Sequence, residues 1–132
     1  MVILSKLADY GVIIATHLAA HAERQMTAAV LAKETNLPRA TVAKILKILA
    51  HAGIVAGARG AAGGYRLARD ASQISVVQVV AAIDGSVGVT QCTIHDDCKR
   101  SAFCATRPHW HRINMAVSTA LGAITLAEMA NP

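Results

Sequence analysis

The chain has 132 residues and a net charge of +5, with 54% hydrophobic residues but only 3% aromatic ones. This length suits one domain with an appended element, and the aliphatic, alanine-rich composition favours helices. No apolar run reaches the roughly 18 residues that span a bilayer, and residues 1–20 lack the basic region of a signal peptide. These features argue against a membrane-spanning or secreted protein. We expect a protein of the reducing cytoplasm, where cysteines more often bind metal or sense redox state than form disulfides.

A first helix is expected over residues 5–20, because Ser5 can cap it. Its apolar stripe at helical spacing is expected to face the core: Leu4, Leu7, Gly11, Ile14, Ala15 and Leu18.

Two further helices are expected in the next thirty or so residues. The first of them begins after Thr27, turns Val30 and Leu31 inward, and ends near Asn36, because the residue before a proline is biased away from helix. The second begins at Pro38, a favourable first-turn residue, and ends at Gly53. Its apolar face follows helical spacing: Val42, Ile45, Leu46 and Leu49.

Two short helices joined by a tight turn, the second one basic, form a helix-turn-helix. The exposed face of the second helix is expected to carry residue types that suit a major groove: Arg39, Ala40, Thr41, Lys44 and Lys47. The alternative is an ordinary amphipathic helix with its lysines in water.

The charge is unevenly distributed along the chain. Between Asn36 and Arg69 there are six basic residues and no acidic one, an excess larger than the net charge of the whole chain. A basic run usually marks only a solvated face, but an acid-free run across two elements favours a polyanionic partner.

A hairpin is expected directly after the helix-turn-helix. Residues 54–56 and 65–67 have the pattern of short strands, and the glycine-rich stretch 57–64 joins them. A hairpin in this place is typical of the wing of a winged helix, with Arg59 and Gly60 at its tip. Arg59 could enter a minor groove, where the negative potential is strongest. The alternative is a surface hairpin without a role in binding.

The C-terminal part is expected to hold two more helices. Ser75 caps one that ends at Asp84-Gly85, and Pro108 opens a long last helix. The last helix has an apolar face that nothing else in a small winged domain would cover: Trp110, Ile113, Val117, Leu121 and Ile124. A second copy of this helix would cover it in a two-fold dimer, although the face could also fold back on its own subunit.

The three cysteines, Cys92, Cys98 and Cys104, are evenly spaced. A step of six residues turns a helix through about 600°, so thiols on a helix would point about 120° apart. We therefore expect a loop that wraps its sulfurs around a common centre. Three is an odd number, so disulfide pairing would leave one thiol over, whereas a metal or cluster with a fourth ligand from elsewhere would use all three.

Together, Leu37-Pro38 with the basic helix, the wing sequence R-G-A-A-G-G-Y-R-L at residues 59–67, and the cysteine triplet resemble the IscR and NsrR type of bacterial iron–sulfur regulators, the Rrf-two family. Within that group the chain is most similar to regulators of SUF iron–sulfur assembly operons, over about residues 5–128. The resemblance implies a cytoplasmic transcription regulator and not an enzyme. It would act as a repressor that senses an iron–sulfur cluster and controls cluster-assembly genes.

The implied fold is mostly α-helical, a winged helix-turn-helix with a two-stranded wing and a long C-terminal dimerisation helix. Its parts would be a DNA-binding domain at 1–84, a cysteine cluster-binding loop at 85–106 and a dimerisation helix at 107–132. A homodimer would read a pseudo-palindromic operator in double-stranded DNA. The residues expected at the DNA are Arg39, Ala40, Thr41, Lys44, Lys47, Arg59, Gly60 and Tyr65.

The resemblance also implies that the three cysteines hold a 2Fe–2S or 4Fe–4S cluster, leaving one ligand to be supplied. In the IscR type that ligand is a histidine three residues after the last cysteine. Here the position is Arg107, which stays protonated and cannot ligate. Substitutes are Asp9 from the partner subunit, as in NsrR-type proteins, His109, His95 or a non-protein ligand.

Other functions use the same residues differently. Structural zinc usually has cysteines two to four residues apart, and a thiol switch would pair two cysteines and leave a third. Nitric oxide or redox state could be the signal instead of cluster supply. Cys92 and His95 could form the nucleophile and base of an enzyme, but no oxyanion or phosphate-binding motif accompanies them. A DNA-packaging protein would use the basic charge but not the cysteines.

Overall fold

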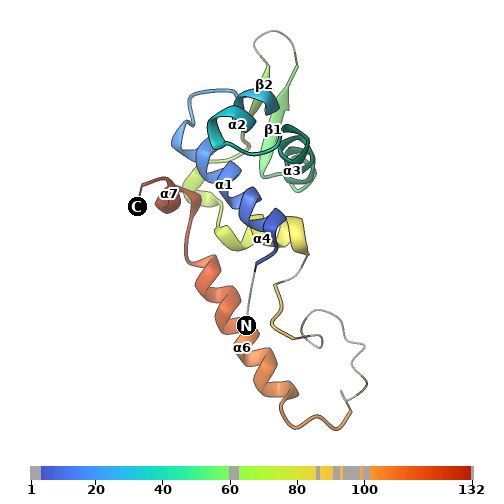
Figure 1. Ribbon diagram of the computed structural model, residues 1–132. Coiled ribbons are helices and arrows are strands. Elements are labelled where there is room, and N and C mark those ends of the chain that lie inside the picture. The colour runs from blue at the N-terminus through green and yellow to red at the C-terminus, as the bar shows by residue number, and fades with distance from the viewer. Residues whose placement is uncertain are drawn as a thin grey trace.

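The computed structural model describes residues 4–59, 63–85, 87–90, 93, 99 and 102–131. A body of helices carries a hairpin at one end, and one long helix extends away from the body at the other (Figure 1). The elements in chain order are α1 (Lys6–Ala20), α2 (Ala28–Thr35), α3 (Arg39–His51), β1 (Val55–Ala58), β2 (Gly64–Leu67), the 3-10 helix η1 (Ala71–Gln73), α4 (Val76–Asp84), α6 (Arg107–Gly122) and α7 (Leu126–Ala130). None of the described helices is both long and apolar enough to cross a membrane.

Helix α1 is the centre of the body. It contacts α2, α3, α4, α7 and β2, and Ser5 caps it as expected by accepting a hydrogen bond from the backbone of Ala8 at 3.0 Å. Most of the predicted stripe is buried, but Leu4 is 41% exposed, because it precedes the first turn of the helix. Gly11 lies so close to α4 that a Cβ there would overlap Cδ1 of Ile83.

Helices α2 and α3 form the predicted helix-turn-helix. Thr27 caps α2, which buries Leu31, but the inward placement of Val30 is wrong, because this side chain lies on the outer face and is 36% exposed. Asn36 ends α2 in a left-handed conformation with φ 58°. Helix α3 ends at His51, two residues before the predicted Gly53. The whole predicted core face of α3 is fully buried: Val42, Ile45, Leu46 and Leu49.

The wing is the predicted two-stranded antiparallel sheet. Val55 pairs with Leu67 and Ala58 with Gly64. The sheet is tied to the α1–α2 connection by a bridge in which the backbone N–H of Met26 donates to Tyr65 at 2.9 Å, and Tyr65 donates back at 2.7 Å. The winged-helix fold class is therefore confirmed.

The C-terminal helix differs from the prediction. Helix α6 ends at Gly122, and Thr125 caps a separate short helix, α7, through a capping box with Glu128. The intervening backbone pairs with the start of α4 instead: the N–H of Val76 donates to Ile124 at 2.9 Å, and the N–H of Leu126 donates to Ile74 at 2.9 Å. One continuous helix through Ile124 was wrong because these strand-like bonds and the Thr125 cap stabilise a break.

Replacing Gly64 by alanine should destabilise the fold. Gly64 has φ +141°, and an added Cβ would lie 2.8–2.9 Å from backbone atoms of Met26. Because backbone cannot move aside cheaply, we expect Gly64→Ala to lower the free energy of unfolding by about 1–3 kcal/mol, measured by urea denaturation.

Gly122→Ala is the matched control. A Cβ at Gly122, in the last turn of α6, would make an ordinary contact at 3.5 Å with Val77. Alanine is the better helix former, so this variant should be neutral or more stable by up to about 1 kcal/mol. Equal stabilities for the Gly64→Ala variant and the unchanged protein would contradict the assigned Met26–Tyr65 bridge.

Candidate nucleic-acid interface and cysteine segment

Helix α3 presents one face to the core and the opposite face to solvent. Of the five residues predicted to contact DNA from this helix, Arg39, Ala40, Lys44 and Lys47 are exposed, and Thr41 is half-buried. Alanines and aliphatic stems form a shallow depression between the two lysines, lined by Ala40, Ala43, Lys44, Lys47 and Ile48. Small residues flanked by cations let a helix come close to a groove lined by phosphates.

The cations of this surface are available to an external anion. Within the described part of the chain, Arg39, Lys44, Lys47 and Arg59 take part in no ion pair, and the two ion pairs found there both involve Glu34. A basic surface without internal carboxylate partners carries its full charge outward, which steers a polyanion toward it.

The wing adds Arg59, exposed at the end of β1, on the same end of the molecule as α2 and α3 (Figure 1). Gly60, also predicted at the DNA, lies outside the described residues. Tyr65 is half-buried; an added Cβ on Gly57 would lie 3.2 Å from its ring, so the ring covers this glycine across the hairpin. This packing gives Tyr65 a structural role in the wing, and a DNA contact by its exposed part stays a prediction.

Of the three cysteines, Cys104 is described, and Cys92 and Cys98 lie outside the described residues, as does His95. Cys104 is half-buried, with its Sγ 3.3 Å from Oγ1 of Thr106. It lies three residues before Arg107, the first residue of α6, and its backbone carbonyl accepts a hydrogen bond from the N–H of Arg107 at 3.3 Å.

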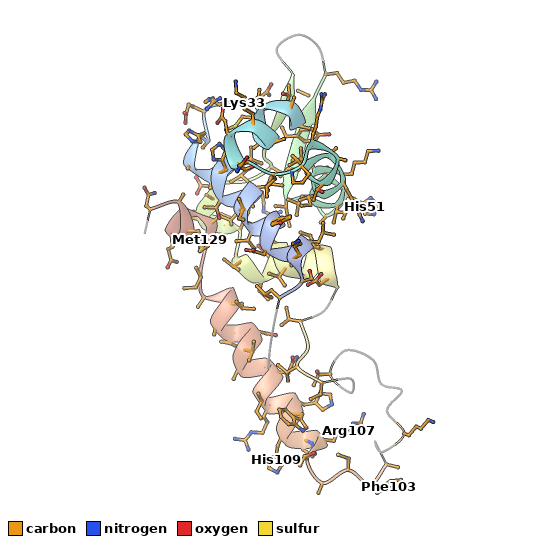
Figure 2. All side chains as sticks on the ribbon, viewed as in Figure 1. Lys33, His51, Phe103, Arg107, His109 and Met129 are labelled. Carbon is orange, nitrogen blue, oxygen red and sulfur yellow. The ribbon has the colours of Figure 1, made fainter. Side chains whose placement is uncertain are left out.

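The two candidate fourth ligands lie in different places. His109 is exposed in the first turn of α6, close to Phe103 and Arg107 at the far end of the molecule (Figure 2). Asp9 is exposed in the first turn of α1, which belongs to the body. In Figure 1, α1 lies in the body and α6 extends away from it. An Asp9 ligand supplied by a second copy stays a prediction.

One group of polar residues was not anticipated from the sequence. His17 and His21 of α1 and Glu34 of α2 place one possible ligand atom each within 4.8 Å of the others. The spacing of the two histidines, four residues apart on a helix, is a visible signal. Nothing in the sequence pairs them with Glu34.

The comparisons of this sequence with known proteins all find transcriptional regulators. A family model described as Rrf2, iron-dependent transcriptional regulator, matches residues 4–132. The HTH-type transcriptional regulator IscR of Photobacterium profundum is 44% identical over 81 residues, which cover 61% of this chain and 47% of that protein. IscR of Vibrio atlanticus is 32% identical over 127 residues, 96% of this chain and 73% of that protein. The chain thus spans about half of the first relative and about three quarters of the second.

Solved structures agree with these sequence relatives. CymR of B. subtilis, described as a global cysteine regulator, has a TM-score of 0.80 at 27% identity, over 98% of this chain and 97% of that one. IscR of T. potens has a TM-score of 0.78 at 28% identity, over 97% and 85% of the two chains. These relatives are transcriptional regulators and not enzymes, so the Cys92–His95 enzyme alternative is set aside.

Proposed function

The chain belongs to the Rrf2 family of iron-dependent transcriptional regulators, and we propose that it represses genes for iron–sulfur cluster assembly in response to a cluster held by its cysteines. The observation that carries this proposal is the pairing of two features on one chain. One end of the described structure presents the basic face of α3 beside the strands β1 and β2, and α6 extends from the other end (Figure 1). Cys104 lies three residues before the start of α6, and Cys98 and Cys92 precede it in the sequence by six and twelve residues.

The DNA-reading part of the proposal rests on α3 and the wing. Helix α3 would lie in the major groove, with Arg39, Lys44 and Lys47 directed at phosphates and base edges. Arg59 would reach the adjacent minor groove from the wing. The buried face of α3 holds it rigidly on the body, so the exposed face is presented as a preformed surface.

The homodimer rests on the apolar surface of α6. Large hydrophobic side chains remain exposed on the predicted face of this helix and just after it, among them Trp110 (37%), Ile113 (44%) and Ile124 (39%). An exposed apolar helix face of this kind favours an interaction site. A two-fold axis along α6 would bury it against the same helix of a second copy and would set the two α3 helices at a fixed separation.

The cysteine segment fits an iron–sulfur cluster by its donor set. Three thiols in thirteen residues are the ligand type that these clusters use, and Cys104 is half-buried three residues before α6. When bound, the cluster would supply an exchangeable, redox-active centre. Asp9 of the partner subunit is the proposed fourth ligand, with His109 as the alternative; a carboxylate or imidazole there exchanges more readily than a fourth thiolate.

Coupling between the two ends would pass through α1. If Asp9 of the partner subunit is a ligand, its helix contacts both the cysteine segment of one copy and the α3 helix of its own copy, because α1 packs on α3. Half-sites lie about one helical turn of DNA apart. A small change in the distance or angle between the two α3 helices would therefore move both helices out of register with their half-sites. A coupling free energy of about 1–3 kcal/mol would suffice for regulation.

Removing the charge of Lys44 should weaken operator binding. We expect Lys44→Ala to reduce the affinity for a duplex selected from a random library by the unchanged protein about tenfold or more, because each protomer loses one base or phosphate contact. The measurement is fluorescence anisotropy over a range of salt concentrations. Lys6→Ala removes the same charge from the first residue of α1, outside α3 and the wing, and should leave the affinity nearly unchanged. Equal losses in both variants would argue against recognition by α3.

A charge on the apolar face of α6 should break the dimer. Ile113→Glu would bury a carboxylate in the proposed interface, which is unfavourable without a partner. We expect light scattering after size exclusion to give a dimer for the unchanged chain and a monomer for Ile113→Glu. Thr119→Glu, at another exposed position of α6, should stay dimeric. A dimeric Ile113→Glu protein would show that another surface joins the copies.

Losing one thiolate should remove the cluster and change DNA affinity. On protein purified without oxygen, Cys98→Ala should abolish the visible absorption, iron and sulfide of the cluster, while the dimer stays folded. Operator affinity should then differ from that of the loaded protein. Unchanged affinity in a demonstrably cluster-free protein would contradict the coupling.

The fourth ligand is tested in the same way. Asp9→Ala should make the cluster more labile, and His109→Ala should not; the reverse result would assign the ligand to His109. A colourless protein with about one zinc per chain would instead make the segment a structural clip. A metal-free protein that takes up no cluster on reconstitution would leave a thiol switch.

A further inference from the structure

His17, His21 and Glu34 form a compact group at the junction of α1 and α2. One possible ligand atom from each lies within 4.8 Å of the other two, and the centres of the two imidazole rings are 4.6 Å apart. His17 lies in the last turn of α1, and His21 is the residue that ends this helix. Glu34 lies near the end of α2. The group therefore joins two helices, and Glu34 lies 17 residues after His17 in the sequence.

The carboxylate of Glu34 is already held in place and ionised. Nη2 of Arg24 donates to its Oε2 at 2.9 Å, and Nε2 of His17 lies 2.8 Å from its Oε1. Hydrogen bonds from Arg24 and then from His17 lower the pKa of Glu34 to about 2. The side chains of His17 and Glu34 are only 22% and 29% exposed, so their positions are restricted by neighbouring atoms.

His21 has a different place in this group. The ion pairs of Glu34 use Arg24 and His17, and the described contact of the His21 side chain is with the ring of His17. An ion-pair cluster that merely fastens α1 to α2 does not require His21. A largely apolar hollow, whose lining includes His17 and Glu34 together with Val12 and Ile13, opens beside the group.

We propose that His17, His21 and Glu34 bind one divalent transition-metal ion, at a site separate from the cysteine segment. Two histidines and one carboxylate are a common donor set for such ions, with the remaining positions open to water. Ligand atoms bound to one zinc ion at about 2.0–2.2 Å lie roughly 3.5 Å apart. The three groups therefore need to close by little more than about 1 Å, which side-chain rotation provides. Arg24 would remain hydrogen-bonded to the carboxylate and orient it from outside.

The donor set also selects the class of ion. Magnesium and calcium prefer oxygen ligands throughout, whereas imidazole suits zinc, nickel, copper and iron. Zinc is the first probe, because it has no redox chemistry and adapts to three protein ligands with an open position. A bound ion would clamp the end of α1 to α2, the first helix of the helix-turn-helix.

The site is distinguishable from the cysteine segment by position and by ligand type. It lies near the α2 end of the body, where Lys33 is labelled, and Phe103 and Arg107 mark the opposite end (Figure 2). The proposal does not depend on a cluster, so it can fail while the regulatory function stands, and the reverse also holds.

The test uses the full chain with Cys92, Cys98 and Cys104 replaced by serine, titrated with zinc in a calorimeter. We expect about one ion per chain, with a Kd of about 10 µM or tighter. We also expect a rise in Tm of about 5–10 °C at saturating zinc. In case the serine variant does not fold, cobalt is added to the unchanged chain after cluster removal. Cobalt at the histidine site should then add visible bands without sulfur-to-cobalt charge transfer.

Two single variants separate metal binding from a plain ion pair. His21→Ala should leave the metal-free Tm nearly unchanged and abolish the zinc-induced rise. Arg24→Ala should lower the metal-free Tm, because it breaks the ion pair, and should keep most of the zinc-induced rise. Zinc binding that is absent, or equally strong in His21→Ala, would overturn the proposal and leave an ion-pair cluster.

Discussion

The close packing of α1 against α4 is the contact on which the remaining structure depends. Gly11 has no side chain, so the two helix backbones approach until Ile83 fills the space that a Cβ would need. Helix α1 also contacts α2, α3, α7 and β2. Dispersion and burial act over very short distances. A wider spacing between α1 and α4 would therefore loosen the support of α3 and of the wing together.

Local sequence signals predicted the helices well where the chain itself supplies the stop or the cap. Ser5 and Ser75 each accept the expected hydrogen bond from the first turn that follows, and Thr27, after which a helix was expected, accepts one as well. The misses came from tertiary contacts, which periodicity does not encode. Val30 fits a helical stripe but faces solvent. Helix α6 stops because its following residues pair with the start of α4, a partner about fifty residues away.

The candidate sites also divide into those that a local sequence pattern predicts and those that depend on tertiary packing. The exposed basic face of α3 follows from one helix and its period, so the sequence could predict it. The grouping of Glu34 with His17 requires the packing of α2 on α1, and no local pattern contains that information. The same reason applies to Asp9 and Cys104: one lies in α1 and the other just before α6, and no local pattern pairs them.

The bonds that join Ile74 and Val76 to Ile124 and Leu126 give α6 a hinge-like root on the body. With sixteen residues, the helix is an arm of about 24 Å at 1.5 Å per residue. Turning it by about 10° at the root moves its far end by about 4 Å, by the same geometry. A displacement of several ångströms at the far end of α6, near Cys104, thus corresponds to only a small rotation where the helix joins the body. Such a rotation changes the angle between α6 and the body with hardly any translation at the root, so it would leave the packing inside the body intact.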